Sequence, residues 1–320
     1  MSARARWQSL CAAWLLAVSC TALAAAPLKS KLVPVKLSQH AWFVRGGTGV
    51  ASMQNEGFNS NAGFVVTDDG VVVIDVLGTP ALGQALLDAI RKITDKPVRR
   101  VILTHYHADH FYGLAPFKAA GAEIWAHQAA LEYLEGGEGA RRLEQRSLEL
   151  SDWVPRDMPL VRADKWLAGD ERFTLGGVAF EVVPMGPAHS PEDVMVVLPN
   201  EGIVFSGDLF FAGRIPFVGE ADSKRWLARI EVLLAANPKI MVPGHGDPSR
   251  DPKADLVLTR DYLRYLREAM GKAVEAMTPF DEAYAATDWR RFKSVPAFDA
   301  ANRVNAYGQY LVLERESLAR

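Results

Sequence analysis

Four side chains that can bind metal ions lie within six residues of this chain. The segment 105–110 reads HYHADH and holds three of the seven histidines in the sequence. It directly follows an apolar run predicted to be a strand, and strand ends present side chains from a rigid scaffold. Side-chain alternation would direct His105 and His107 the same way. The turn after them could direct Asp109 and His110 to a second point about 3.5 to 4 Å away, the usual separation of paired ions.

Three later loops each carry one more residue of the same chemical kind. His189, Asp208 and His245 each follow an apolar run that is predicted to be a strand. A nearby glycine lets each of these loops turn tightly beneath the side chain. Taken singly, each residue is explained equally well as a turn acid or a capping histidine. Their order and spacing after the 105–110 segment indicate a shared metal site.

These residues resemble the metallo-β-lactamase superfamily, whose members share an HxHxDH loop, a later histidine, a bridging acid and a last histidine. The resemblance extends from about Trp42 to His245. It implies an αββα fold and two metal ions, which we expect to be zinc, although imidazole and carboxylate ligands also suit iron or manganese. The implied ligands are His105, His107 and His189 for the first ion, Asp109, His110 and His245 for the second, and Asp208 for both.

The acid at position 208 narrows the expected chemistry. In the antibiotic-hydrolysing members of the family, the residue at the matching position looks more like cysteine or serine. A bridging aspartate instead resembles the pattern of glyoxalase II, lactonases and alkylsulfatases. We therefore expect a hydrolase that uses a hydroxide shared by two ions to cleave an ester, thioester, lactone or related bond of a small molecule. Asp109 would hold the hydroxide and relay its proton. The alternatives are a β-lactamase, an iron-dependent oxidoreductase and a non-catalytic metal-binding module.

Four further residues have less specific signals. Asp75 ends a predicted strand and could orient the ligand loop, although a plain turn acid explains it nearly as well. Arg214 could hold a substrate carboxylate or form a structural ion pair. We interpret Tyr106 as a wall of the cleft, although tyrosine also packs routinely in cores. Asn59 could flank the entrance, but an ordinary turn role is the stronger expectation.

Hydrophobic periodicity predicts an α/β protein with two mixed sheets between layers of helices. Apolar runs with turn residues between them predict antiparallel strands from Val33 to Ile74. Thr79 and Pro80 predict the start of a helix. A charged stretch, 131–164, is predicted to form helices or a covering insert. The remaining expected elements are strands at 101–104, 173–175, 178–183, 194–198, 203–205 and 240–242, and helices at 223–236, 255–277 and 297–316.

The composition limits the domain count and the class of partner. A chain of 320 residues with 49% hydrophobic and 23% charged residues can form one large domain. We expect residues 25–320 to form it, with a helical extension at 252–320. The net charge changes from −2 to −4 when Arg4 and Arg6 are removed with the leader. Such a balance disfavours nucleic acid and anionic lipid as partners, and nothing in the sequence indicates an oligomeric state.

Residues 1–24 have the parts of a secretory signal peptide. Two arginines precede an apolar core from Leu10 to Val18, and small residues follow at cleavage spacing around Ala24. This core is too short for a membrane span, which needs about 20 apolar residues. We therefore expect export through the inner membrane to the periplasm. Both cysteines, Cys11 and Cys20, lie in the leader, so the mature chain would have no disulfide or thiolate ligand.

Overall fold

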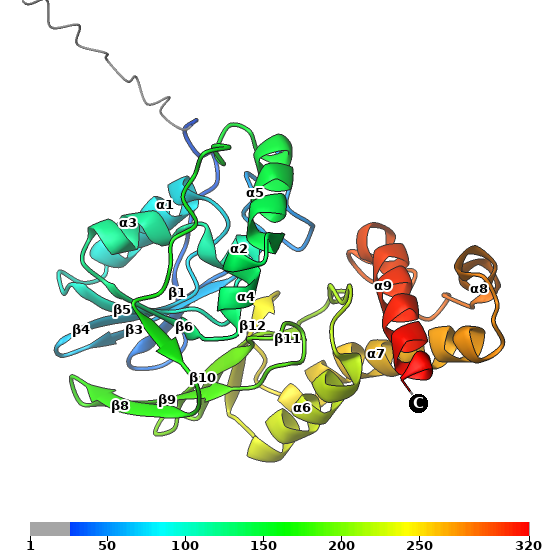
Figure 1. Cartoon of the computed structure of the whole chain (residues 1–320). Helices are drawn as coiled ribbons and strands as arrows, with labels where there is room; N and C mark the ends of the chain where they lie inside the picture. Colours follow the sequence, from blue (N-terminus) through cyan, green and yellow to red (C-terminus); the bar gives the residue numbers. More distant parts are fainter. Residues whose placement is uncertain (1–25, 320) are drawn as a thin grey trace, which may run out of the picture.

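Two stacked β-sheets form the centre of the fold in the computed structural model, which describes residues 26–319 (Figure 1). The larger sheet is mixed, because its first four strands pair antiparallel and its last four pair parallel. From edge to edge its strands are β1 (Val35–Lys36), β2 (Ala41–Val44), β3 (Ala62–Thr67), β4 (Gly70–Ile74), β5 (Val98–Ile102), β6 (Glu123–His127) and β7 (Lys165–Leu167).

The second sheet has five strands and is mixed as well. Its order is β12 (Ile240–His245), β11 (Ile203–Phe211), β10 (Val194–Leu198), β9 (Val178–Pro184) and β8 (Glu171–Leu175). Only the β11–β12 pair is parallel. Gly176 and Gly177 join β8 to β9 with φ angles of +48° and +82°. Such angles are those of a tight hairpin turn and favour glycine, as the sequence predicted.

Helices cover the outer face of each sheet, so the predicted αββα order is confirmed (Figure 1). The space between the sheets is filled by buried apolar side chains from both, among them Val72, Ile102 and Phe205. Outside the larger sheet pack α1 (Pro80–Arg91) and α3 (Leu114–Ala119), and outside the smaller sheet pack α6 (Ser223–Ala236) and α7 (Pro252–Glu275).

Local sequence signals account for where two of these helices begin. The Thr79 side chain accepts a hydrogen bond from the Leu82 backbone N–H at 3.1 Å, and proline occupies the first turn of α1. The Asp222 side chain likewise accepts from the Arg225 N–H at 2.9 Å at the start of α6. These side chains satisfy N–H groups that have no partner within the helix. Both helices are therefore found where they were predicted.

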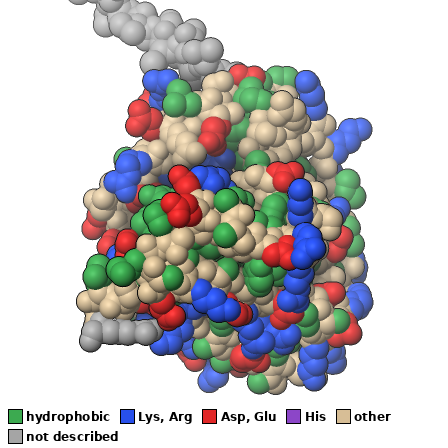
Figure 2. Space-filling model, turned by 90° about the vertical axis from the view of Figure 1, so that its right-hand side faces the viewer, with side chains coloured by type: hydrophobic (Ala, Val, Ile, Leu, Met, Phe, Trp, Pro, Cys, Tyr) green, Lys and Arg blue, Asp and Glu red, His purple; other side chains and the backbone are tan. Residues whose placement is uncertain are grey.

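The stretch 131–164 is helical as far as Glu149 and has no helix from there to Asp164, whereas the C-terminal extension is largely helical, as expected. The first contains most of α4 (Ala130–Glu135) and α5 (Glu138–Glu149), and a short helix, α2 (Ala108–Phe111), lies close to α5. The extension consists of α7, α8 (Phe280–Ala286) and α9 (Phe298–Leu318), which form a helical unit beside the smaller sheet (Figure 1). On the face shown in Figure 2, basic and acidic side chains are interspersed.

The proposed signal peptide lies outside the described residues. Within residues 26–319, no helix has both the length and the apolar character that crossing a bilayer requires.

Candidate metal centre

The seven expected ligands, which lie up to 140 positions apart in the sequence, come together in two adjoining groups. In each group, the atoms able to bind a metal lie within 4.8 Å of one another. The first group consists of His105, His107, His189 and Asp208, and the second consists of Asp109, His110 and His245. The loop after β5 therefore contributes to both groups, as alternation and the following turn predicted.

The Asp208 carboxylate lies between the two groups. Its Oδ2 atom is 3.4 Å from Nε2 of His189 and 3.9 Å from Nε2 of His105, both in the first group. The same oxygen is 3.4 Å from Nε2 of His245, and Oδ1 is 3.3 Å from Nε2 of His110, both in the second group. One carboxylate thus faces nitrogen atoms of both groups, which is the geometry required of a ligand shared by two ions.

The buried ligand atoms fit a bound cation better than they fit one another. Within residues 26–319, Nε2 of His105, Nε2 of His110 and Oδ1 of Asp208 are buried without a hydrogen-bond partner. Nδ1 of His107 and Nε2 of His189 face each other at 3.0 Å. Leaving buried polar atoms unpaired costs about 1–3 kcal/mol each, and a cation at their centre would remove that cost.

The electrostatics also favour positive charge at this point. Burial lowers the pKa of His107 to about 3 and that of His189 to about 4, so both imidazoles are neutral, the form that binds a metal. Burial alone would raise the pKa of Asp208, but the charges of His245 and His110 outweigh it and hold the pKa well below its usual range. The first ligand group therefore combines two neutral imidazoles with an ionised carboxylate.

Asp75 orients two of the histidines, one directly and one through Thr104. Its Oδ2 accepts hydrogen bonds from Nδ1 of His110 at 2.9 Å and from the Thr104 hydroxyl at 2.8 Å. Its Oδ1 accepts from the Thr104 backbone N–H at 2.8 Å. The Thr104 hydroxyl is also 3.0 Å from Nδ1 of His105. These contacts turn Nε2 of both histidines toward the centre, and so support the orienting role over a plain turn.

Asn59 contacts both Asp109 and His245, which the sequence did not indicate. Its amide Nδ2 donates to Oδ2 of Asp109 at 2.8 Å, and its backbone carbonyl accepts from Nδ1 of His245 at 2.6 Å. Nearby, Asn61 donates to the carbonyls of Pro243 and Gly246 at 2.9 and 2.8 Å and holds the loop that carries His245. The loop between β2 and β3 therefore positions ligands of the second group, beyond the turn role expected of Asn59.

Two buried acids that sequence reasoning missed hold the loop that carries His189. Glu192 accepts a hydrogen bond from the Tyr106 backbone N–H at 3.0 Å, which connects this loop to the 105–110 segment. Asp193 accepts from the backbone N–H and the hydroxyl of Ser190, each at 2.8 Å. Burial raises the pKa of both carboxyl groups. The available signal was an acidic pair placed directly before the apolar run of β10.

The interpretation of Tyr106 as a wall of the cleft is wrong. Its side chain is fully buried, and its ring packs against Phe111 at 4.5 Å and Trp166 at 6.2 Å between ring centres. Its hydroxyl donates to the Val161 carbonyl at 3.2 Å. Side chains alternate along this segment, so the alternation that directs His105 and His107 toward the metal centre directs Tyr106 into the core.

Arg214 is a buried cation that forms no ion pair within residues 26–319. Its side chain lines a cavity of about 290 Å³ that also reaches His107, Asp109, Asp208 and His245. The residue is 3% exposed, and Nη1 donates to the Gly49 carbonyl at 3.1 Å. No carboxylate lies within 4.0 Å of its guanidinium among residues 26–319, so the structural ion pair considered above is not formed there. Burial lowers its pKa, since the charge is held away from water.

The insert overhangs this cavity. Four polar side chains of α5 contribute to its lining: Arg142, Gln145, Arg146 and Glu149. The expectation that the 131–164 stretch forms helices above the site therefore agrees with the structure. The same helix places two more guanidinium groups at the cavity, of which Arg146 is paired with Glu149 at 2.9 Å.

Comparison with known proteins gives consistent matches. A family model described as the metallo-beta-lactamase superfamily matches residues 55–245. The chain is 27% identical over 240 residues to the linear primary-alkylsulfatase of Pseudomonas sp. (strain ATCC 19151), a match covering 64% of this chain and 45% of that protein. It is 25% identical over 219 residues to metallo-beta-lactamase IND-1 of Chryseobacterium indologenes, covering 67% and 81%. The chain thus spans less than half the length of the alkylsulfatase.

Solved structures share the fold. A metallo-beta-lactamase from Pontibacter korlensis superimposes with a TM-score of 0.58 at 24% identity, covering 73% of this chain and 99% of that one. A sec-alkyl sulfatase superimposes with a TM-score of 0.66 at 19% identity, covering 89% of this chain and 50% of that one.

Proposed function

Because the chain belongs to the metallo-β-lactamase superfamily and is a metal-dependent hydrolase, we propose that it binds two zinc ions and cleaves an ester, thioester, lactone or related bond of a small molecule. The observation that carries this proposal is the position of the Asp208 carboxylate, which faces nitrogen atoms of both ligand groups. An aspartate at position 208 also favours these bonds over a β-lactam, because in the antibiotic-hydrolysing members of the family the residue at the matching position looks more like cysteine or serine.

Each ion would have three ligands of its own and would share Asp208. The first set is His105, His107 and His189, and the second is Asp109, His110 and His245. Imidazole and carboxylate without thiolate suit zinc. A cavity of about 290 Å³ reaches ligands of both sets, so that water and a substrate can approach either ion. Access of this kind is typical of catalytic rather than structural metal sites and favours an enzyme over a non-catalytic binding module.

The side chains around the centre have distinct roles in the proposed reaction. Bound divalent cations would supply Lewis acidity toward a carbonyl oxygen and would lower the pKa of a water toward about 7. Asp109 is held by Asn59 at 2.8 Å, and the charges of His110 and His245 lower its pKa despite burial. It therefore stays ionised, orients the attacking water by accepting its hydrogen, and relays the proton to the leaving group. The remaining side chains fix these positions.

We also propose that the protein acts after export. The support is the order of features in residues 1–24: two arginines, a short apolar core and small residues around Ala24. An intact mass from the periplasmic fraction should correspond to a chain that begins near residue 25, and a mass that includes Met1 would contradict export with cleavage.

A hydrolysis panel on zinc-loaded mature protein tests the proposed function. The panel contains carboxylic esters, thioesters, lactones, sulfate esters and β-lactams. We expect turnover of at least one of the first three classes, abolished by a chelator and restored by zinc. Turnover of β-lactams alone would refute the proposed bond. No turnover with both sites filled would favour a binding module, and oxidation that requires iron would favour the oxidoreductase alternative.

A further inference from the structure

The metal centre lies where two cavities with different linings adjoin. The first is the cavity of about 290 Å³ that contains Arg214, and the second measures about 790 Å³ and reaches His107 and His189. Both are lined by His107, Arg142 and Phe217, so they meet beside the first ligand group. A substrate that extends from one cavity into the other would pass the metal centre.

The smaller cavity suits an anion. Arg214 is almost fully buried in its wall, and no carboxylate lies within 4.0 Å of its guanidinium among the described residues, although the charges of Asp208 and Asp109 act on it from farther away. It therefore forms no direct ion pair that a ligand would have to break. The wider cavity is lined by Arg142 and by four acids, of which Glu138, Glu220 and Asp222 are each paired with an arginine. Its charges are therefore largely balanced and give an anion no preferred position there. An anionic group is therefore favoured beside Arg214.

The wider cavity presents an apolar surface on α9. Val304, Tyr307 and Leu311 line it at helical spacing, which places them on one face. Val304 is 53% exposed and Tyr307 is 50% exposed, so both present accessible apolar surface to the cavity. Phe217 connects this surface to the metal centre, since its ring centre lies 6.4 Å from that of His107. We call the surface formed by Val304, Tyr307 and Leu311 of α9, together with Phe217, the α9 shelf.

Buried polar contacts hold the α9 shelf against the loop that carries Arg214. The Asn305 side chain accepts from the Val218 N–H at 2.8 Å and donates to the Pro216 carbonyl at 2.8 Å. Gln309 donates to the carbonyls of Gly219 and Ala221, each at 3.0 Å. Gly308 permits this approach, because a Cβ atom there would lie 2.2 Å from the Gly219 carbonyl oxygen. The shelf and Arg214 therefore form one prearranged surface.

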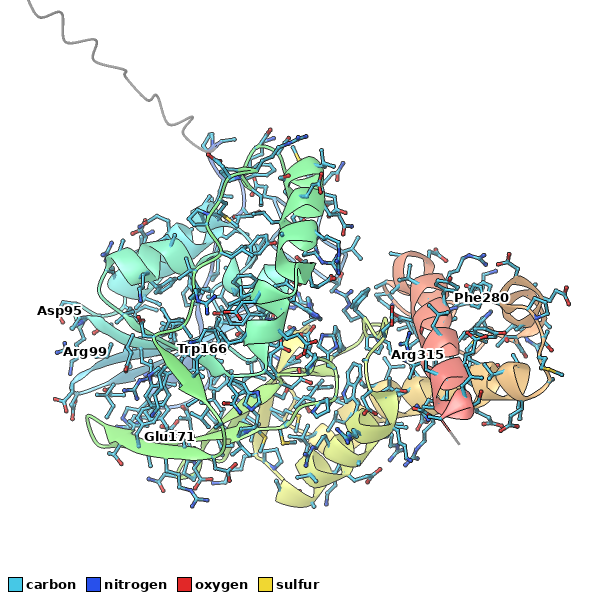
Figure 3. The ribbon with its side chains drawn as sticks, viewed as in Figure 1. Asp95, Arg99, Trp166, Glu171, Phe280 and Arg315 are labelled. Atoms are coloured by element: carbon cyan, nitrogen blue, oxygen red, sulfur yellow. The ribbon has the colours of Figure 1, made fainter. Side chains whose placement is uncertain are left out.

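The outer side of the shelf is supported as well. Phe280, on α8, packs against Tyr307 with 5.0 Å between ring centres, and it lies beside α9 in the stick view (Figure 3). Tyr307 remains half-exposed despite this contact and contributes to the lining of the cavity. The shelf thus has little freedom to lose when a ligand binds, which favours affinity.

We propose that the substrate is an amphipathic anion whose charged group is bound by Arg214 and whose apolar body lies on the α9 shelf. The proposal rests on the proposed function in one respect, because it places the bond to be cleaved at the metal centre between the two cavities. It assigns a role in specificity to α9, which lies outside the region matched by the family model.

Binding of non-hydrolysable sulfonates to the zinc-loaded protein tests the proposal without requiring turnover. Isothermal titration calorimetry would compare 1-butanesulfonate, 1-octanesulfonate and the octyltrimethylammonium cation. We expect octanesulfonate to bind about tenfold more tightly than butanesulfonate, since four more methylene groups leave water on a partly open surface. The cation should bind at least about tenfold more weakly than octanesulfonate, because Arg214 would repel it.

Variants of the α9 shelf and of Arg214 separate the apolar contact with the ligand from the ionic one. The double variant V304N/Y307S should reduce the octane-to-butane affinity ratio to below about 3, whereas V232N should keep the full ratio. Val232 is a matched control, because it is 46% exposed on α6 and lines neither cavity. Arg214→Met should weaken both sulfonates about tenfold, and Arg214→Lys should recover part of that loss because it keeps the charge. Thermal unfolding of each variant would verify that it is folded.

Three results would overturn the proposal: equal affinity for the two sulfonates, unchanged sulfonate binding by folded Arg214→Met, or an oligomer that V304N/Y307S dissociates. The last result would identify the shelf as an interface between copies of the chain. A protein that binds sulfonates as expected but hydrolyses nothing in the panel would refute the proposed function and leave this inference intact. A protein that hydrolyses a substrate of the panel but does not bind sulfonates as expected would refute only this inference.

Discussion

Asp208→Ala is expected to lower kcat/KM by about a thousandfold or more, the largest effect of any single substitution at the centre. The carboxylate faces His110 and His245 on one side and His105 and His189 on the other. Its loss would remove the ligand that the two ions share, together with the negative charge that offsets part of theirs. Steady-state kinetics on the best substrate of the panel would measure the effect.

The control for this substitution is Asp170→Ala, which removes an exposed acid before β8. It should leave kcat/KM within about twofold of the original value, since surface changes away from special features have small effects. Circular dichroism would show that both variants are folded. Near-original turnover by a folded Asp208→Ala protein would contradict the assignment of Asp208 as the shared ligand.

The second large expected effect is on metal affinity in Asp75→Ala. This acid does not belong to either ligand group, yet it accepts hydrogen bonds from His110 and from both the backbone and the hydroxyl of Thr104. Without it, Nδ1 of His110 loses its partner and the ring is free to rotate away. We expect zinc affinity to fall by about 10- to 100-fold, as is typical for groups that orient metal ligands.

Competition with a chromophoric chelator would measure the zinc affinity of Asp75→Ala, with the exposed Asp69→Ala as the control. Chemical unfolding of the metal-free proteins would show how much of the effect is general destabilisation. The orienting role predicts weaker zinc binding by a protein that is still folded. A folded variant with the zinc affinity of the original chain would reduce Asp75 to a structural turn residue.

The parts of this site that could be predicted are those encoded locally. The 105–110 segment follows an apolar strand, and its alternation carries His105 and His107 to one group, with Asp109 and His110 reaching the other. The same alternation directs Tyr106 away from the metal centre and into the core, where its ring is buried.

Other parts depend on contacts between distant segments. Asn59 reaches Asp109 across 50 positions, and Glu192 reaches the Tyr106 backbone across 86. A lone asparagine in a loop is more often a turn residue, so no local pattern distinguishes it. The shelf formed by α9 is of the same kind, because helical spacing predicted the helix but could not indicate that Val304 and Tyr307 would face the cavity. Such roles become visible only when the chain is folded.

The metal content of the purified mature chain, measured by elemental mass spectrometry together with anomalous diffraction at the zinc edge, tests whether the seven side chains hold a pair of ions. We expect two ions per chain, one within each ligand group, with Asp208 between them. Removal of either ion should abolish turnover. A fully active chain that holds one ion or none, or ions bound away from these seven side chains, would contradict the two-ion assignment.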